Sequence, residues 1–190
     1  NNRAQKGLTL THECIVDEHK PSLINLFKQK QTDILLATLI DLSRNITHSI
    51  FLWNMMGLAF TELERFDDAI AVFNRALALD PENADTLNNM GNALQSHGDV
   101  NAAIDAYKRA TKIKPNNAEA YRNMGIAQQK LGWFKDALVS YELAISFKTD
   151  YAACYNDIGN ILQRLGRRVE ALEAYKNALN FQPNFLEAYR

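Results

Sequence analysis

Apolar and polar residues follow one another along this chain with the spacing of amphipathic helices, and one block of the pattern returns at a fixed interval. Residues 103–110 read Ala-Ile-Asp-Ala-Tyr-Lys-Arg-Ala, and residues 69–76, 137–144 and 171–178 keep the same order of small, apolar and aromatic positions. Each block begins 34 residues after the one before it. Apolar residues three or four positions apart predict helices, and the interval predicts four repeated units. The units span 50–83, 84–117, 118–151 and 152–185.

Small residues alternate with large ones at fixed positions of each unit. Glycine stands at the eighth position and alanine at the twentieth and twenty-seventh, while an aromatic residue stands at the twenty-fourth. Small side chains let two helices approach closely, so each unit is predicted to be a pair of helices that stacks on its neighbours. The glycines are Gly57, Gly91, Gly125 and Gly159, and the aromatic residues are Phe73, Tyr107, Tyr141 and Tyr175.

A turn is predicted in the middle of each unit. Gly98, Gly132 and Gly166 stand where the first helix must end in a left-handed residue, a conformation that glycine adopts without strain. Glu64 takes this place in the first unit, so we expect a less favourable turn there. Proline near the end of three of the units stops the second helix.

This arrangement closely resembles the tetratricopeptide repeat (TPR) over residues 50–185. The resemblance implies an all-α fold, a right-handed α-α superhelix or TPR solenoid of antiparallel helix pairs. In such a solenoid the first helix of each pair lines the concave face and the second lines the convex face.

The resemblance extends in weaker form beyond these units. Counting back one interval gives a degenerate helical cap at 16–49, with Lys30 at the turn position and Pro21 near the start of its first helix. Residues 1–15 are expected to form an N-terminal tail, and residues 186–190 match the start of a further repeat.

The sequence carries no motif of a catalytic or cofactor site, so we expect no enzyme activity, catalytic residue, metal or cofactor. The four histidines share no ligand spacing, and Cys14 and Cys154 lie far apart, which favours two reduced thiols. The acidic pair at 67–68 begins a predicted second helix, where carboxylates favour the helix dipole. We interpret the basic cluster at 164–168 as a solvated helix end rather than an anion site.

Composition narrows the classes of partner. Lys and Arg total 21 and Asp and Glu total 22, a net charge of −1, which argues against a broad nucleic-acid-binding face. No apolar run is long enough to span a membrane, so we expect neither nucleic acid nor membrane as a partner. The sequence does not determine the compartment, and the cytoplasm is the expectation.

The resemblance places positions two, five, six, nine, twelve and thirteen of each unit on the concave face, and amides dominate these positions. An amide offers a donor and an acceptor, so it can pair with a peptide backbone of any sequence. The alternative is that these residues only keep an exposed helix face soluble. The candidate peptide-binding residues are Asn54, Asn88, Asn89, Asn92, Gln95, Arg122, Asn123, Gln129, Asn156, Asp157, Asn160 and Gln163.

We therefore predict a non-enzymatic scaffold that binds a protein or peptide in an extended conformation. Two alternatives stay open. The chain can be the substrate-recruiting region of a larger bacterial transferase, such as a sulfotransferase or a glycosyltransferase, or a self-assembling module whose open ends form a homo-oligomer. A carboxylate clamp of the kind found in chaperone-binding members is disfavoured, because Asn88, Ala153 and Asp157 stand where it needs cations.

At both ends of the repeated region, apolar residues lack a neighbouring full repeat that would bury them. We expect the cap at 16–49 to cover the apolar residues of the first unit, the alternative being an apolar pocket. The last unit is expected to lack cover. These residues are Phe51, Met55 and Leu58 in the first unit, and Tyr175, Ala178, Leu179 and Phe181 in the last.

Overall fold

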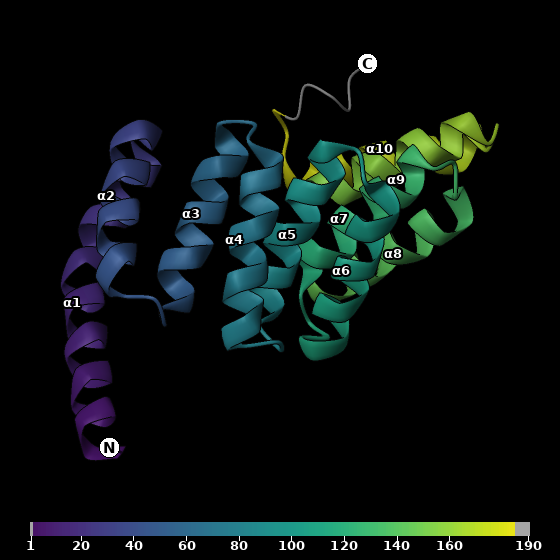
Figure 1. Ribbon diagram of the computed structural model, residues 1–190. Coiled ribbons are helices and arrows are strands. Elements are labelled where there is room, and N and C mark those ends of the chain that lie inside the picture. Colours follow the sequence, from purple (N-terminus) through teal and green to yellow (C-terminus); the bar gives the residue numbers. More distant parts are fainter. Residues whose placement is uncertain (1, 185–190) are drawn as a thin grey trace. The chain divides into compact units, whose positions relative to one another are not determined.

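The computed structural model describes residues 2–184, with side chains from residue 15 onward. This part of the chain consists of α helices joined by short turns, without strands, which confirms the predicted all-α class (Figure 1). The helices are α1 (Asn2–Lys28), α2 (Thr32–Asn45), α3 (Ile50–Glu62), α4 (Phe66–Leu79), α5 (Ala84–His97), α6 (Val100–Ile113), α7 (Ala118–Lys130), α8 (Phe134–Phe147), α9 (Ala152–Arg164) and α10 (Arg168–Phe181).

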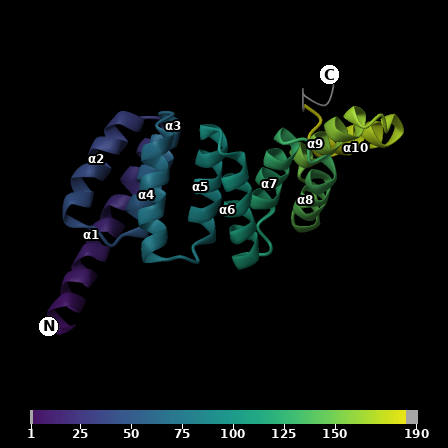
Figure 2. The same ribbon diagram turned by 45° about the vertical axis from the view of Figure 1, so that its right-hand side comes forward.

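The chain forms two compact units, Asn1–Ala93 and Leu94–Arg190, with the boundary inside α5. In the first unit α1 packs on α2, α2 on α3 and α3 on α4. In the second unit α6 packs on α7, α7 on α8, α8 on α9 and α9 on α10. The pairs α7–α8 and α9–α10 run antiparallel, as the repeat pattern predicts (Figure 2).

Polar residues just before the first helices fix where these helices begin. The side chains of Ser49, Asn83 and Asn117 each accept a hydrogen bond from the backbone N–H three residues later. Such a cap satisfies one of the N–H groups that the first helical turn leaves without a partner. The caps lie at equivalent places, so α3, α5 and α7 each begin at the same position of their repeat.

Glycine at position eight brings the two helices of a pair into contact, as the sequence predicts. A β-carbon added to Gly125 would lie 2.6 Å from Cε1 of Tyr141, closer than non-bonded carbon atoms approach. Gly57 stands in the same relation to Phe73, and Gly159 to Tyr175. The aromatic ring at position twenty-four therefore rests directly on the backbone of the first helix.

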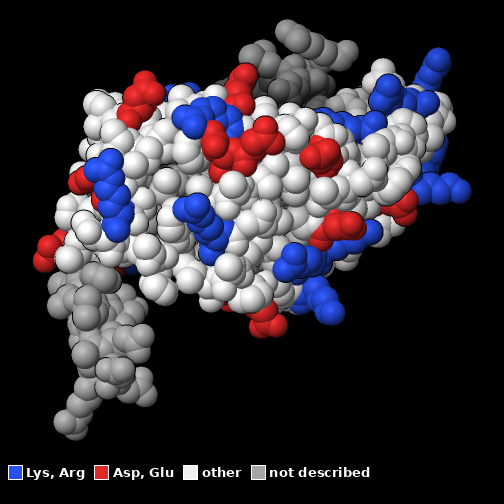
Figure 3. Space-filling model, viewed as in Figure 1, with Lys and Arg blue, Asp and Glu red and all other residues white. Residues whose placement is uncertain are grey.

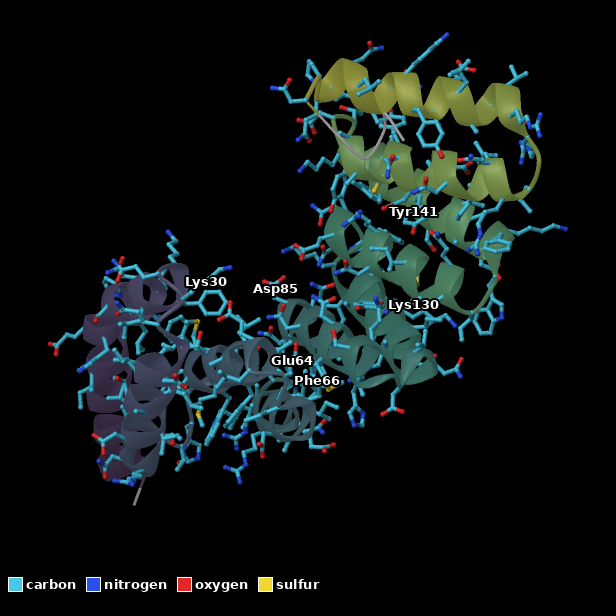
Figure 4. All side chains as sticks on the ribbon, turned by 90° about the horizontal axis from the view of Figure 1, so that it is seen from above. Lys30, Glu64, Phe66, Asp85, Lys130 and Tyr141 are labelled. Carbon is cyan, nitrogen blue, oxygen red and sulfur yellow. The ribbon has the colours of Figure 1, made fainter. Side chains whose placement is uncertain are left out.

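The turns within the pairs adopt the left-handed conformation. Gly98, Gly132 and Gly166 have φ values of 107°, 77° and 77°. Glu64 and Lys30 occupy the same place with φ values of 57° and 55°, and both are labelled in Figure 4. The prediction that Glu64 and Lys30 take the glycine position is confirmed, and each carries the steric cost of a side chain there.

Replacing Glu64 with glycine is expected to stabilise the first unit by about 0.5–1 kcal/mol. The left-handed conformation costs a non-glycine residue about 1–2 kcal/mol, and the larger conformational freedom of unfolded glycine offsets part of the gain. Urea unfolding followed by circular dichroism measures the change. Asn74→Gly is the control, because Asn74 is exposed inside α4 and glycine there costs about 0.5–1 kcal/mol. A loss of stability in Glu64→Gly would contradict the expectation.

The N-terminal helix is longer than predicted. In place of a tail over 1–15 and a helix that starts near Pro21, α1 runs from Asn2 to Lys28 with Pro21 inside it. Residues 8–20 contain neither proline nor glycine, so nothing in this stretch ends a helix. Proline removes one backbone hydrogen bond and bends a helix, but the helix continues when the residues on both sides keep a helical conformation.

The N-terminal helices cover the apolar residues of the first repeat, in agreement with the expectation. Met55 is buried, and Phe51 and Leu58 are partly buried. The ammonium group of Lys20 in α1 lies 5.3 Å from the centre of the Phe51 ring. Thr32 at the start of α2 donates a hydrogen bond to Glu62 at the end of α3. These contacts hold α1 and α2 against α3.

The last helix pair leaves apolar surface exposed, as expected, since Phe181 is 48% exposed, but not at every residue named from the sequence. Ala178 is fully buried within its own repeat, and the ring of Phe181 stacks on Tyr155 with 5.5 Å between the ring centres. The apolar side chains that α10 exposes most are Val169 at 82% and Leu172 at 56%. The exposed apolar surface of α10 therefore includes Val169, Leu172 and Phe181, and it does not include Ala178.

Candidate functional site

Side chains at position five join neighbouring first helices. Nε of Arg122 in α7 donates to Oδ2 of Asp157 in α9 over 2.9 Å. In the first unit, Nδ2 of Asn54 in α3 donates to Oγ1 of Thr86 in α5 over 2.7 Å. Both side chains therefore hold first helices together, a role that the sequence pattern did not reveal.

The other two residues at position five are buried. Asn88 is 5% exposed and Asn156 is 4% exposed, which corrects the expectation that both lie on the ligand-binding surface. Among the described residues, the buried Oδ1 atoms of Asn54 and Asn156 accept no hydrogen bond. A buried acceptor without a partner costs about 1–3 kcal/mol. Position five is therefore either buried or bonded to a neighbouring first helix, rather than open to a ligand.

A tyrosine fixes the glutamine at position twelve in each of three repeats. Oη of Tyr141, which is labelled in Figure 4, donates from α8 to Oε1 of Gln129 in α7 over 3.0 Å. Tyr107 and Gln95 form the same pair over 3.4 Å, and Tyr175 and Gln163 over 2.9 Å. The sequence did carry this signal, since the first repeat has Thr61 and Phe73 at these positions and both change together.

The hydrogen bonds orient the glutamine side chains. The tyrosine hydroxyl takes the carbonyl oxygen of each amide, and no described hydrogen bond uses the amide nitrogen of these glutamines. Tyr175 Oη also lies 2.9 Å from Oδ1 of Asn160, so its single proton is donated to either Gln163 or Asn160 at any one time. Because the glutamines are half-buried or exposed, each keeps two N–H donors that a ligand can use.

The remaining predicted residues divide between the two units. Asn89 and Asn92 are half-buried in the first unit, while Asn123 and Asn160 are half-buried in the second. With the oriented glutamines, Asn123 and Asn160 give the second unit a polar face on its first helices. This polar face is defined by Gln95, Asn123, Gln129, Asn160 and Gln163.

The Arg122 guanidinium beside the polar face remains charged. Burial alone would lower the pKa of Arg122, but the neighbouring Asp157 carboxylate outweighs it and holds that pKa above its ordinary value. The guanidinium also lies 5.8 Å from the centre of the Tyr151 ring. Burial raises the pKa of the nearby Cys154 thiol to about 12, so this cysteine is a packing residue rather than a nucleophile.

One member of the acidic pair and one member of the basic cluster form ion pairs at helix starts. Asp68 pairs with Arg65 at the start of α4, and Arg167 pairs with Glu170 at the start of α10. The described residues contain no group of His, Cys, Asp or Glu that could hold a metal ion. On the face seen in Figure 3, basic and acidic residues are interspersed rather than gathered into one surface of a single sign.

Comparison with known proteins agrees with this geometry. A family profile described as TPR repeat matches residues 57–98 and 91–132, and a second, described as tetratricopeptide repeat, matches residues 152–185. The chain belongs to the tetratricopeptide repeat family. No curated protein matches its sequence.

Solved TPR structures share the fold of this TPR protein. Pseudomonas aeruginosa PilF has a TM-score of 0.84 at 16% identity, over 94% of this chain and 81% of PilF. MamA from Desulfovibrio magneticus RS-1 has a TM-score of 0.78 at 16% identity, over 89% and 96%. YrrB, described as a TPR protein with an unusual peptide-binding site, has a TM-score of 0.71 at 19% identity, over 94% and 95%. At these identities the likeness shows the fold alone.

No helix in the described part of this TPR protein is both long and apolar enough to cross a membrane.

Alkaline pH is expected to lower the stability of the second unit of the TPR protein. Burial raises the pKa values of the Cys154 thiol and of the phenols Tyr107 and Tyr141, so the folded chain keeps protons that the unfolded chain loses. Their contribution is complete below the unfolded values, about 8.5 for cysteine and about 10 for tyrosine, and is lost as pH rises towards the folded values.

Urea unfolding between pH 7 and 11 tests this expectation. Stability should change little up to about pH 8 and fall above about pH 9, by up to about 1.4 kcal/mol per pH unit for each group. In Cys154→Ala the decline should begin later, near the ordinary tyrosine pKa. Stability that rises between pH 9 and 11 would contradict the expectation.

Proposed function

We propose that the chain is a non-catalytic interaction module in which the polar face of the second unit binds an extended polypeptide segment. The observation that carries the proposal is the pairing of Gln95, Gln129 and Gln163 with tyrosines of their own repeats. A side chain already held in place loses less conformational entropy when a ligand binds. Three oriented amides are therefore better suited to binding than three mobile ones.

The chemistry of these amides selects a peptide backbone. Each glutamine offers N–H donors, and a peptide in an extended conformation offers carbonyl acceptors along both sides. Packed helices lie about 8–10 Å apart, and an extended chain advances about 3.3–3.6 Å per residue. One repeat thus corresponds to about three peptide residues, and backbone recognition of this kind depends little on the peptide's sequence.

The neighbouring residues add limited selectivity. Asn123 and Asn160 extend the polar face along α7 and α9. Arg122 and Asp157 neutralise each other, so neither sign of charge dominates the middle of the face. We therefore infer a ligand without a strong net charge, bound with only mild dependence on salt. YrrB, a TPR protein with an unusual peptide-binding site, supports the same class of ligand.

Selection of linear peptides tests the proposal. A phage-displayed library of random twelve-residue peptides is selected on the chain, and a binding peptide is titrated into the isotopically labelled protein. The amide N–H signals of Gln95, Gln129 and Gln163 side chains should shift on binding. Shifts confined to other parts of the chain would place the ligand elsewhere and contradict the proposal.

A further inference from the structure

A groove lies between the second helices α8 and α10, and residues of α9 line its base. Its floor is apolar, and its volume is about 360 Å³. The floor residues of α9 lie about half a turn of that helix from Asn160 and about a third of a turn from Gln163, so they point away from the polar face. The groove is therefore separate from the polar face. Its floor consists of Ile145, Tyr155, Ile158, Leu162 and Ala174.

Carboxylates stand on both rims of the groove. Glu142 comes from α8, and Glu170 and Glu173 come from α10, while no lysine or arginine lines it. Glu170 is paired with Arg167 at one end. One repeat earlier, the positions of the three glutamates hold Lys108, Asp136 and Val139, so the acidic rims do not follow from the repeat pattern.

The outward face of α10 has the complementary chemistry. Val169 is 82% exposed and Leu172 is 56% exposed, although position eighteen, which Val169 occupies, is polar in the other three repeats. Arg168 and Lys176 are exposed and lie four residues on either side of Leu172, so they share its side of the helix. This basic apolar face of α10 consists of Arg168, Val169, Leu172 and Lys176.

We propose that the α8–α10 groove of one copy receives the basic apolar face of α10 from a second copy of the chain. Val169 and Leu172 enter the apolar floor, and the long side chains of Arg168 and Lys176 reach the carboxylates on the rims. Charge complementarity between these two surfaces selects this occupant. The contact joins two different surfaces, and it is small, so the association is weak and reversible.

Sedimentation velocity over a range of protein concentrations tests the proposal. The chain should associate reversibly, and association should weaken several-fold between low salt and 0.5 M NaCl because rim charges are screened. Val169→Asp should abolish association. Val139→Asp makes the same change at an exposed valine of α8 outside the groove, and association should persist. Circular dichroism and thermal melting check that each variant is folded.

Mixing two defective variants gives the sharper test. Glu142→Lys damages the groove and leaves the basic apolar face intact, whereas Val169→Asp does the reverse. Each variant alone should be a monomer, and an equimolar mixture should form a one-to-one complex through the intact surface of each. A chain that stays monomeric at all concentrations, equal loss in Val139→Asp, or a mixture that does not associate would each overturn the proposal.

Discussion

Replacing Tyr141 with alanine is expected to lower the free energy of unfolding of the second unit by about 3–5 kcal/mol. Tyr141 is fully buried in a cluster with Ala137, Ala144 and Cys154. Removing a buried aromatic ring loses its transfer free energy and leaves a cavity that the surrounding helices fill only in part. The ring also rests on the backbone at Gly125, so the substitution loosens the contact between α7 and α8.

Urea unfolding followed by circular dichroism measures this loss, and Tyr141→Phe is the matched control. Phenylalanine keeps the ring and removes only the hydroxyl that donates to Gln129, so the expected loss is about 0.5–1.5 kcal/mol. Equal losses in the two variants would mean that the hydrogen bond, rather than ring packing, holds the helix pair together.

Replacing Gly125 with alanine is expected to cost about 1–3 kcal/mol. Alanine is the better helix former by about 1 kcal/mol, so propensity alone predicts a gain. The added β-carbon would lie 2.6 Å from a ring atom of Tyr141, and that ring is fully buried. Overpacking of this kind forces helices apart and outweighs the gain in propensity.

A double variant separates overpacking from other causes. Gly125→Ala combined with Tyr141→Leu should lose less stability than the two single changes added together, because the smaller side chain leaves room for the β-carbon. Gly132→Ala supplies a second control, since nothing lies within 4 Å of an added β-carbon there and only its φ of +77° opposes the substitution. A stability gain in Gly125→Ala would contradict the packing described above.

The parts of the fold that depend on spacing could be predicted from the sequence. The 34-residue spacing of the repeats predicts the helix pairs, and a glycine opposite an aromatic ring predicts the close contact within each pair. Left-handed turns at Glu64 and Lys30 followed from position alone. The length of α1 could not be read in the same way, because Pro21 marks a bend inside a helix as readily as a helix start.

The sequence predicted which residues belong to the candidate site, but not which of them pack between helices and which face a ligand. Amides at positions five and twelve look alike in sequence, yet Asn156 is buried, whereas Gln129 is half-buried and accepts a hydrogen bond from Tyr141. Which role a side chain takes depends on the distance between neighbouring helices and on what stands opposite it. The role of Asn54 is set by its hydrogen bond to Thr86, and the role of Arg122 by its ion pair with Asp157. The pattern of a single sequence does not show that these positions pair.

Exchange of glutamine for glutamate tests the proposed peptide binding most directly. Gln129→Glu with Gln163→Glu keeps an oxygen that accepts from Tyr141 and Tyr175, and it replaces each amide donor with an acceptor. Asn101→Asp with Asn180→Asp makes the same charge change at exposed residues of the second helices and serves as the control.

The measurement is the affinity of each double variant for a selected linear peptide, taken together with its thermal melt. The proposal predicts that the glutamate variant binds at least about tenfold more weakly, because peptide carbonyls then face carboxylates, while its melting temperature stays near that of the unchanged chain. The control should bind normally. Unchanged affinity in the glutamate variant would show that the oriented amides do not bind the peptide, and would contradict the proposal.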